Sequence, residues 1–332
     1  MTARAFIDHV NGDGSDYLSA IRAGLAYVDF GIGLPAKPRV FVKPNLTFPS
    51  YRPGVMTSPA AVEALILALK DYTPHIWLGD SDSGGYNRFS MDEVYVTTGV
   101  AEYATRHGVE VVNLSHLPTQ SVSFECRGRP LTLALPRLLT SEIDVLITMP
   151  VPKVHVNTGV SLTFKNQWGC IPEPTDRLRL HPYFKEVILE VNRAVKAKYA
   201  VIDGRYGLNG SGPLQGDPVE LGWLCVTDDI GAGARVSCHL MQVSTRNVRH
   251  LRHAERQGWI PDLDAIEVNR DLAPFRGPKF KANRVWTDLP GWAAFHSPSL
   301  AHLAYFSKWA GPLHQLLYRF REPFYNYGDS ER

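Results

Sequence analysis

Short apolar runs alternate with helix-length segments along most of this chain, and this alternation restricts the fold more than any other feature. The runs, which we expect to be strands, lie at residues 40–43, 75–78, 109–113, 145–149 and 199–203. The intervening segments predict helices at residues 58–70, 91–106 and 182–196. Strands separated by helices form crossover connections, so the sequence predicts an α/β fold with a mostly parallel sheet and helices on both of its faces.

Composition indicates an ordinary globular protein. Of the 332 residues, 44% are hydrophobic and 20% are charged, with a net charge of +2 that suggests neither a nucleic-acid nor a membrane partner. The four cysteines are scattered without a C-x-x-C pair, so we expect free thiols in a reducing compartment and no iron–sulfur cluster. No signal-peptide run and no stretch of eighteen apolar residues is present, which predicts a cytoplasmic protein without a membrane span.

The chain changes character near residue 285. Aromatic and basic residues dominate from there to residue 332. We expect a core over residues 1–284 and a helical C-terminal extension over residues 285–332. The extension is expected to pack on the core or to form a homo-oligomer contact, with attachment to a membrane surface as the alternative.

Polar residues follow the ends of four of the expected strands. They are Lys43 and Asn45, then Asp80 and Asp82, then Lys153, His155, Lys165 and Asn166, and lastly Asp203 with the glycine-rich stretch to Gly216. Ligands of parallel α/β sheets bind outside the carboxyl ends of the strands. We therefore expect Lys43, Asp80, His155 and Asp203 to share one cleft.

Each of these residues also has a purely structural interpretation. Lys43 can be a solvated charge, Asp80 and Asp82 can cap a turn or the next helix, and the glycines of residues 204–216 can form a plain turn-rich loop. The histidines can be satisfied core residues. Lys165 is the strongest functional candidate, because a lysine beside Leu162 and Phe164 needs a partner or a shifted pKa.

With these motifs in view, residues 38–240 resemble the family called domain of unknown function 362. The matching elements are Lys43-Pro-Asn45, Thr57-Ser-Pro59, Gly79-Asp80, Pro152-Lys-x-His155, Lys165-Asn166 with Gly169, His181, and Ile202-Asp-Gly204 before Gly212-Pro-x-x-Gly216. Many members also carry a ferredoxin-type cluster domain. This chain lacks its cysteines, so electron transfer through an attached cluster does not carry over.

A more remote resemblance is to the lactate racemase family, through the intervals between His155, Lys165 and His181. It implies that Lys165 holds a nickel-pincer nucleotide covalently, that His181 ligates the metal and that His155 moves the substrate proton. The second histidine of that family is replaced by Asp80-Ser-Asp82, which makes symmetric racemisation a poor expectation.

The favoured function is an enzyme that acts on a small polar or anionic metabolite by proton or hydride transfer. We expect an isomerase or racemase, an oxidoreductase, or an enzyme that modifies a biosynthetic intermediate. The cofactor is open between a divalent metal and a nickel-pincer-type nucleotide. The alternatives are a non-catalytic protein that binds a nucleotide, cofactor or metal, and an assembly protein built on the extension. The expected catalytic residues are His155, Lys165 and Asp82, the substrate-binding residues are Lys43, Asn45, Asp80, Lys153, Asn166 and Asp203, and the metal ligand is His181.

Overall fold

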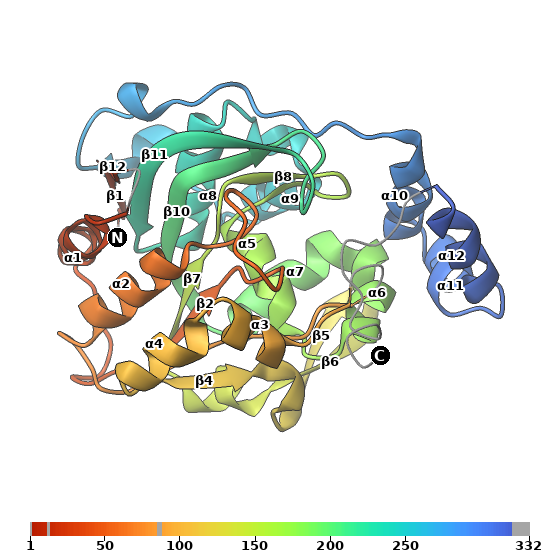
Figure 1. Cartoon of the computed structure of the whole chain (residues 1–332), viewed down its shortest axis with the longest axis horizontal. Helices are drawn as coiled ribbons and strands as arrows, with labels where there is room; N and C mark the ends of the chain where they lie inside the picture. Colours follow the sequence, from red (N-terminus) through yellow and green to blue (C-terminus); the bar gives the residue numbers. More distant parts are fainter. Residues whose placement is uncertain (1, 12–13, 85–87, 321–332) are drawn as a thin grey trace.

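One ten-stranded sheet organises the fold (Figure 1). The computed structural model describes residues 2–11, 14–84 and 88–320. Eight strands follow one another across the sheet in the order β12 (Ile266–Val268), β1 (Ala3–His9), β11 (Asp217–Thr227), β10 (Ala197–Asn209), β7 (Val145–Met149), β2 (Val40–Pro44), β3 (Ile76–Asp80) and β4 (Glu110–Asn113). The remaining two form a small branch, in which β8 (Lys153–His155) pairs with β10 and with β9 (Gly159–Ser161).

The sheet is mostly parallel, as predicted. Strands β10, β7, β2, β3 and β4 all run in one direction, and β11 lies antiparallel between β10 and β1. All five expected strands are present, as β2, β3, β4, β7 and β10. An additional hairpin, β5 (Thr119–Cys126) with β6 (Arg129–Pro136), lies outside the main sheet.

Helices cover both faces of the sheet because side chains alternate along each buried strand. Val40 and Val42 of β2 pack in one hydrophobic cluster, whereas Phe41 packs in a second. The first cluster is shared with α1 (Tyr17–Tyr27), α2 (Pro59–Leu69), α3 (Met91–Thr97) and α4 (Val100–Arg106). The second is shared with α5 (Thr163–Asn166), α7 (Phe184–Ala194), α8 (Ile230–Leu240) and α9 (Arg249–Arg256). The turn from α5 into α7 includes α6 (Pro174–Leu180).

Two of the expected helices differ from their predicted extents. The segment 91–106 is two helices, because Gly99 at the junction has a φ of 76°, which ends the first helix. The segment 182–196 begins with a short 3-10 turn, His181–Tyr183, before α7 starts at Phe184. The third expected helix is α2, with Ser58 at its N-cap and Pro59 in its first turn.

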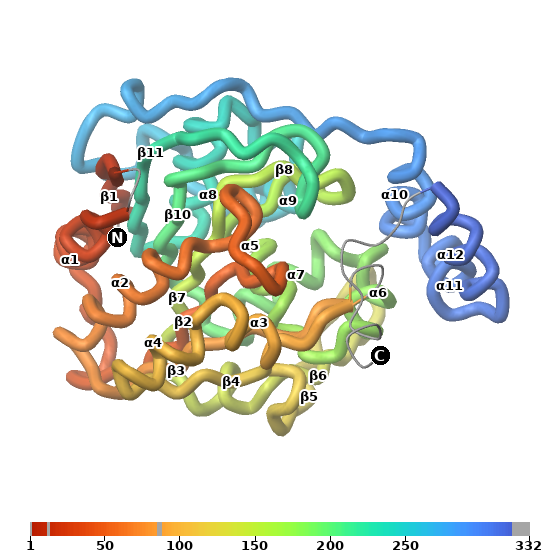
Figure 2. Tube along the Cα trace, in the orientation of Figure 1, coloured from red at the N-terminus to blue at the C-terminus, as the bar shows by residue number. Residues whose placement is uncertain are grey.

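A long connection crosses the molecule from β12 to three helices at one side, α10 (Leu289–His296), α11 (Pro298–Tyr305) and α12 (Ala310–Tyr318) (Figures 1 and 2). These helices confirm the helical character of the extension as far as residue 320, and residues 321–332 lie outside the described part. The core covers α10, where Ala294 and Phe295 are buried, but α12 has no buried residue. The boundary between residues 284 and 285 stays a prediction. Within the described ranges, every helix falls short of the length and hydrophobicity needed to cross a bilayer.

Candidate functional site

A buried ion pair joins the carboxyl ends of β2 and β3. The Nζ atom of Lys43 lies 2.7 Å from Oδ2 of Asp80, and the two side chains are only 1% and 7% exposed. Asp80 also accepts a hydrogen bond from the amide of Ser81 at 2.9 Å. The two strands are adjacent and parallel, so the polar residues that follow them in the sequence meet at one edge of the sheet.

Gly169 allows the chain to pass directly over this pair. A Cβ atom at this position would lie 2.4 Å from Oδ1 of Asp80 and 3.1 Å from Nζ of Lys43. Any side chain would therefore push the pair apart or displace the turn that follows α5.

We expect Gly169→Ala to lower the free energy of unfolding by about 1–3 kcal/mol, because it overpacks a buried charged contact. Gly291→Ala is the control, since a Cβ there meets nothing within 4 Å and the residue lies in α10. Relieving the flexibility of a helical glycine is expected to leave that variant as stable as the parent or slightly more stable. Equal urea midpoints for the two variants would contradict the role of Gly169.

Three more cations lie around the Lys43–Asp80 pair. Lys153 of β8 is 1% exposed, and its Nζ donates to the carbonyl of Val55 at 2.7 Å. Arg177 of α6 donates to the Ser81 hydroxyl at 3.2 Å and to the carbonyl of Asp82. Lys165 of α5 is partly buried and makes no hydrogen bond or ion pair with the described residues. Lys43, Lys153, Lys165 and Arg177 form what we call the cationic cluster.

Burial and mutual repulsion shift the pKa values within this cluster. Burial, followed by the charges of Lys43 and Arg177, lowers the pKa of Lys165 from 10.5 to about 8. Burial lowers the pKa of Lys153 well below its ordinary value, and the charge of Lys165 adds to the effect. Burial causes most of these shifts, and repulsion from the neighbouring cations adds to them.

Three imidazoles lie within reach of the Lys165 charge. Burial first, and then that charge, lowers the pKa of His155 well below its ordinary value and the pKa of both His181 and His250 to about 3. All three rings are therefore neutral at neutral pH. His250 belongs to α9 and was not among the residues predicted from the sequence.

The rings are held in different ways. The Nδ1 atom of His155 accepts a hydrogen bond from the amide of Asn157 at 3.1 Å, which leaves the proton of the neutral ring on Nε2. His181 stacks against Trp168 at 5.9 Å and lies 4.6 Å from the ring of Phe295. The Nε2 atom of His250 is buried without a hydrogen-bond partner in the described structure.

A pocket of about 270 Å³ opens beside His181 and His250. It is formed by the β8–β9 turn, the start of α7, the start of α9, and α10. The lining residues are Arg127, Asn157, Thr158, Gly159, His181, Pro182, Phe184, Lys185, Asn247, Arg249, His250, Arg284, Trp292, Phe295 and His296. No carboxylate is among these lining residues, so the pocket favours anions.

Two arginines supply most of the uncompensated charge in this pocket. Arg127 and Lys185 share the carboxylate of Glu186, at 2.9 and 3.1 Å. Arg249 instead contacts Nδ1 of His296 at 3.0 Å, and Arg284 donates to the carbonyl of Val156 at 2.6 Å. Among the described residues, neither Arg249 nor Arg284 forms an ion pair with a carboxylate.

The two expected amide ligands donate hydrogen bonds within the protein. Asn45 donates to the carbonyl of Val55 at 3.0 Å. Asn166 donates to the carbonyl of Lys43 and to the Thr148 hydroxyl, both at 2.9 Å. These bonds use the amide N–H groups to fix the loop after β2 and the start of the turn after α5. Asn45 and Asn166 therefore help to position these segments, and their part in substrate binding stays a prediction.

Asp82 follows β3, and its carboxylate contacts the beginning of α3. Its Oδ1 accepts from the amide of Met91 at 2.7 Å and from the side chain of Asn113 at 2.9 Å. This is the capping interaction that the sequence allowed as the alternative to catalysis.

Asp203 lies on the opposite face of the sheet from Lys43, so the expected single cleft is wrong in this respect. Val201 of β10 packs in the cluster with α1 and α2, and Asp203, two residues further on, points the same way. Its carboxylate accepts from the Tyr17 hydroxyl at 2.6 Å and from the amide of Ser58 at 2.8 Å. Burial raises the pKa of Asp203.

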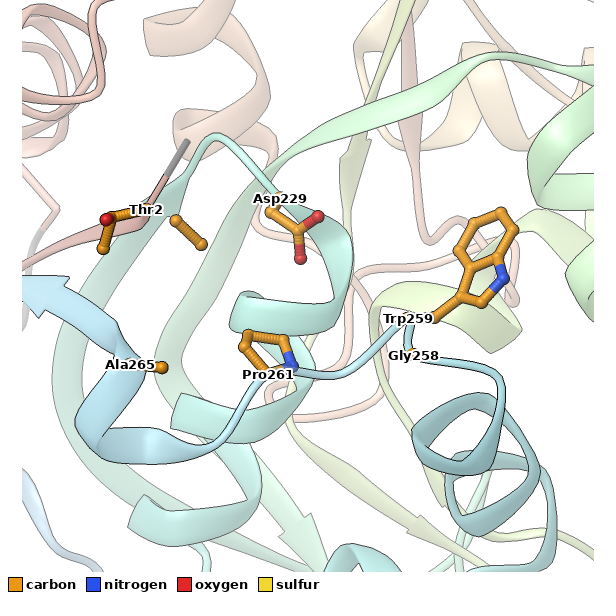
Figure 3. Close-up of a pocket in the computed structure, with 7 residues that line it drawn as sticks. Thr2, Asp229, Gly258, Trp259, Pro261 and Ala265 are labelled. Carbon is orange, nitrogen blue, oxygen red and sulfur yellow. The ribbon is translucent and has the colours of Figure 1, made fainter.

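A wider depression of about 500 Å³ lies elsewhere on the molecule, beside β1 and the start of α8 (Figure 3). It is lined by Thr2, Ala3, Asp229, Gly258, Trp259, Pro261 and Ala265. The one carboxylate among these, Asp229, accepts from the amide of Ala232 at 2.7 Å and so caps α8. With no cation or histidine in its lining, this depression offers little chemistry.

Comparison with known proteins gives one curated relative and six solved chains, two of which are described below. The thylakoid-associated protein sll1697 of Synechocystis sp. is 27% identical over 243 residues, which are 70% of this chain and 72% of the relative. A lactate racemase apoprotein from Thermoanaerobacterium thermosaccharolyticum is similar with a TM-score of 0.46 and 11% identity, over 73% of this chain and 57% of that one. A Thermotoga maritima protein gives a TM-score of 0.39 and 14% identity, over 57% of this chain and 51% of its own. The chain thus spans little more than half the length of these two solved structures.

The sequence of the core matches one family model directly. The model described as "Domain of unknown function (DUF362)" matches residues 40–239, which is more than half of the chain. This range contains the Lys43–Asp80 pair and the whole cationic cluster. The protein belongs to the DUF362 family.

Proposed function

We propose that the protein is an enzyme that binds a small anionic metabolite between the cationic cluster and the arginine-lined pocket, and acts on it by proton transfer. One observation carries this proposal. Four buried or partly buried cations surround a single buried carboxylate, Asp80. Burying an unpaired cation is costly, so an anionic ligand is the natural counter-charge for this region.

Lys165 is the residue proposed to carry the chemistry. With a pKa of about 8, roughly a tenth of its amines are neutral at pH 7, so the side chain is poised to accept a proton or attack a carbonyl group. His155 and His250 are neutral rings near the same charge, and their low pKa values suit them to hydrogen-bond a substrate without taking up its proton. Asp82 is not included, because its carboxylate is engaged at the start of α3.

The pocket supports a small substrate with a carboxylate or phosphate group. Its volume of about 270 Å³ lies below the usual range for drug-sized ligands. Guanidinium groups such as those of Arg249 and Arg284 bind such oxyanions in a fixed, two-pronged geometry. The reaction class is proposed as isomerase-like, with hydride transfer as an alternative that would need a separate redox cofactor.

A second candidate is a non-catalytic protein that holds a nucleotide or cofactor. The aromatic rings of Phe184, Trp292 and Phe295 line the pocket and favour this alternative, since they offer flat faces for a base. The discriminating experiment is incubation of the protein with candidate hydroxy-, keto- and amino-carboxylates in heavy water. Proton transfer predicts deuterium incorporation at the carbon beside the carboxylate, followed by NMR, whereas a binding protein leaves the compounds unlabelled.

The described residues offer no metal centre made of protein ligands alone. Among the described residues, no group of three or more histidine, cysteine, aspartate or glutamate side chains could hold a metal ion. A divalent metal would therefore need ligands from an organic cofactor, with one imidazole from the protein. Toward a nickel-pincer-type nucleotide, Lys165 offers an unpaired amine and Arg249 and Arg284 offer sites for its phosphate, whereas the ring of His181 is already stacked on Trp168.

We expect Arg249→Gln to weaken binding of inorganic phosphate or of a small carboxylate by about tenfold, because a charge-assisted hydrogen bond to the anion is lost. Arg252→Gln is the matched control, since Arg252 belongs to the same helix but is exposed and does not line the pocket. Isothermal titration of both variants measures the difference. Equal affinities for the two variants would remove Arg249 from the proposed site.

A further inference from the structure

Helices α10 to α12 and the residues just before them expose an unusual amount of apolar surface. Of the thirteen large hydrophobic side chains that are exposed in the described structure, eleven lie between residues 285 and 320. Single exposed hydrophobic residues are common on soluble proteins, whereas a concentration of this kind marks an interaction site. The eleven are Val285, Trp286, Leu289, Trp292, Leu300, Leu303, Trp309, Leu313, Leu316, Tyr318 and Phe320.

The exposed residues around α12 form a regular stripe. Trp309, Leu313, Leu316 and Phe320 follow one another at intervals of four, three and four residues, which places them along one side of a helix. Their exposed fractions are 56%, 41%, 52% and 59%. An amphipathic helix normally turns such a stripe toward the protein core, but this one faces outward.

The stripe is continuous with the beginning of the extension. The rings of Trp286 and Phe320 pack edge to face at 5.2 Å, although they are 34 positions apart in the chain. Helices α10, α11 and α12 also stand together at one side of the molecule (Figures 1 and 2). We call the eleven exposed residues together the apolar face.

The charged residues of the segment that carries the apolar face are mostly basic. Within residues 285–320 the sequence has two such residues, Lys308 and Arg319, and one acidic residue, Asp288, which is buried. At about 100° per residue, Lys308 and Arg319 both fall on the same flank of the stripe.

We propose that the apolar face docks on an anionic lipid surface. Outward-facing tryptophan, phenylalanine and leucine side chains with flanking lysine and arginine are the features of helices that lie in the plane of a membrane interface. The basic residues complement anionic headgroups, while their aliphatic stems remain over the acyl chains. The helices have eight or nine residues, so they suit insertion along the surface.

The same charges disfavour a second copy of the chain as the occupant. In a two-fold contact through this face, Lys308 and Arg319 of one protomer would approach those of the other without an exposed carboxylate from residues 285–320 to pair with them. The proposal is also independent of the proposed enzymatic function, because none of its tests measures turnover.

The test is co-flotation of the full chain with vesicles of phosphatidylcholine alone and of phosphatidylcholine mixed with phosphatidylglycerol. We expect the protein to float with the anionic vesicles only. The double variant Leu313→Gln/Leu316→Gln should bind about tenfold more weakly or worse, since it removes apolar contact without changing the charge. The variant Lys308→Gln/Arg319→Gln should also bind about tenfold more weakly, and added salt should weaken binding of the parent.

The matched control is Ile32→Gln/Val96→Gln, which removes two exposed hydrophobic side chains outside the apolar face. It should bind like the parent. The proposal is overturned if the parent fails to float with anionic vesicles, or if the leucine variant floats as well as the control does. A parent that ignores vesicles but forms a dimer, which the leucine variant dissociates, would identify a second copy as the occupant instead.

Discussion

Asp80→Asn is expected to lower the free energy of unfolding by about 3–5 kcal/mol, because it leaves the buried Lys43 ammonium without its counter-charge. The change preserves the shape of the side chain and its acceptor for the Ser81 amide, so the loss reports on charge. Among the described residues, Asp80 is the carboxylate that pairs with Lys43, and the neighbouring Lys153 and Lys165 add to the positive charge left behind. Urea denaturation measures the effect through the shift in the midpoint, provided that the dependence of the free energy of unfolding on urea concentration is the same in both proteins.

A surface pair provides the control for this prediction. Arg22 and Asp71 lie 2.8 Å apart, about as close as Lys43 and Asp80, but both side chains are about half exposed. Asp71→Asn should therefore cost less than about 1 kcal/mol. Adding Lys43→Met to Asp80→Asn should restore much of the lost stability, because the uncompensated charge is then removed. A loss in Asp80→Asn no larger than that in Asp71→Asn would contradict the importance of the buried pair.

The parallel sheet was predictable because its strands are buried on both faces and read as continuous apolar runs. Because both faces of these strands are buried, the pattern of apolar residues did not show toward which face Asp203 points. Residues 199–203 read Tyr-Ala-Val-Ile-Asp, with apolar residues at both odd and even positions, so the sequence did not indicate which face the aspartate occupies. Its strand neighbours in space, and the α1 tyrosine that binds it, decide the matter.

The hairpin of β5 and β6 was not predicted, although its turn residues indicate it. Arg127 and Gly128, between the two strands, both have positive φ values, of 53° and 75°. Two such residues form the tight turn typical of β-hairpins, and glycine favours it. The flanking residues alternate in burial as expected for a strand pair with one covered face.

The site was predictable in part, because residues close in sequence to the strand ends are carried to the same edge. Lys43, Asp80, Lys153 and Lys165 are brought near one another in this way. Arg249, His250 and Arg284, which line the pocket, were not predicted, since they reach it from distant segments. The one available signal was His250 itself, which lies next to the buried Leu251 and four residues before the buried Ala254 at the start of an otherwise charged helix.

Replacing Lys165 with methionine is expected to have opposite effects on stability and on ligand binding. The variant keeps most of the aliphatic side chain and removes an unpaired charge, so the free energy of unfolding should rise by about 1–3 kcal/mol at pH 7. Lys37→Met is the control, because Lys37 is exposed and its replacement should change stability by less than about 0.5 kcal/mol. Lys165→Arg keeps the charge and should show no gain. If Lys165 only fills space, Lys165→Met and Lys165→Arg should have similar stability.

The pH dependence of this gain follows from the direction of the pKa shift. The pKa of Lys165 falls from 10.5 in the unfolded chain to about 8 in the folded protein, so its charge destabilises the fold fully below about pH 8. Between about pH 8 and 10.5 the penalty disappears, because the amine is neutral in the folded state and then in both states. The stability difference between Lys165→Met and the parent should therefore shrink as the pH is raised through this interval. A difference that stays constant with pH would show that packing, and not charge, causes the gain.

The affinity for an anion should also depend on the titration of Lys165, and it should be highest where Lys165 is charged. The parent is expected to bind a small carboxylate, which is itself ionised in this range, with an affinity that is constant between about pH 5 and 7, because His181, His250 and His296 have pKa values of about 3, 3 and 4 and stay neutral there. Above about pH 8 the affinity should fall as Lys165 loses its proton. Lys165→Met should bind the anion more weakly at pH 7, and its affinity should not fall further above pH 8. Lys37→Met should bind like the parent at every pH. Titration calorimetry across this range separates the two cases, and a parent whose affinity changes near pH 6 would assign the anion site to a histidine instead of Lys165.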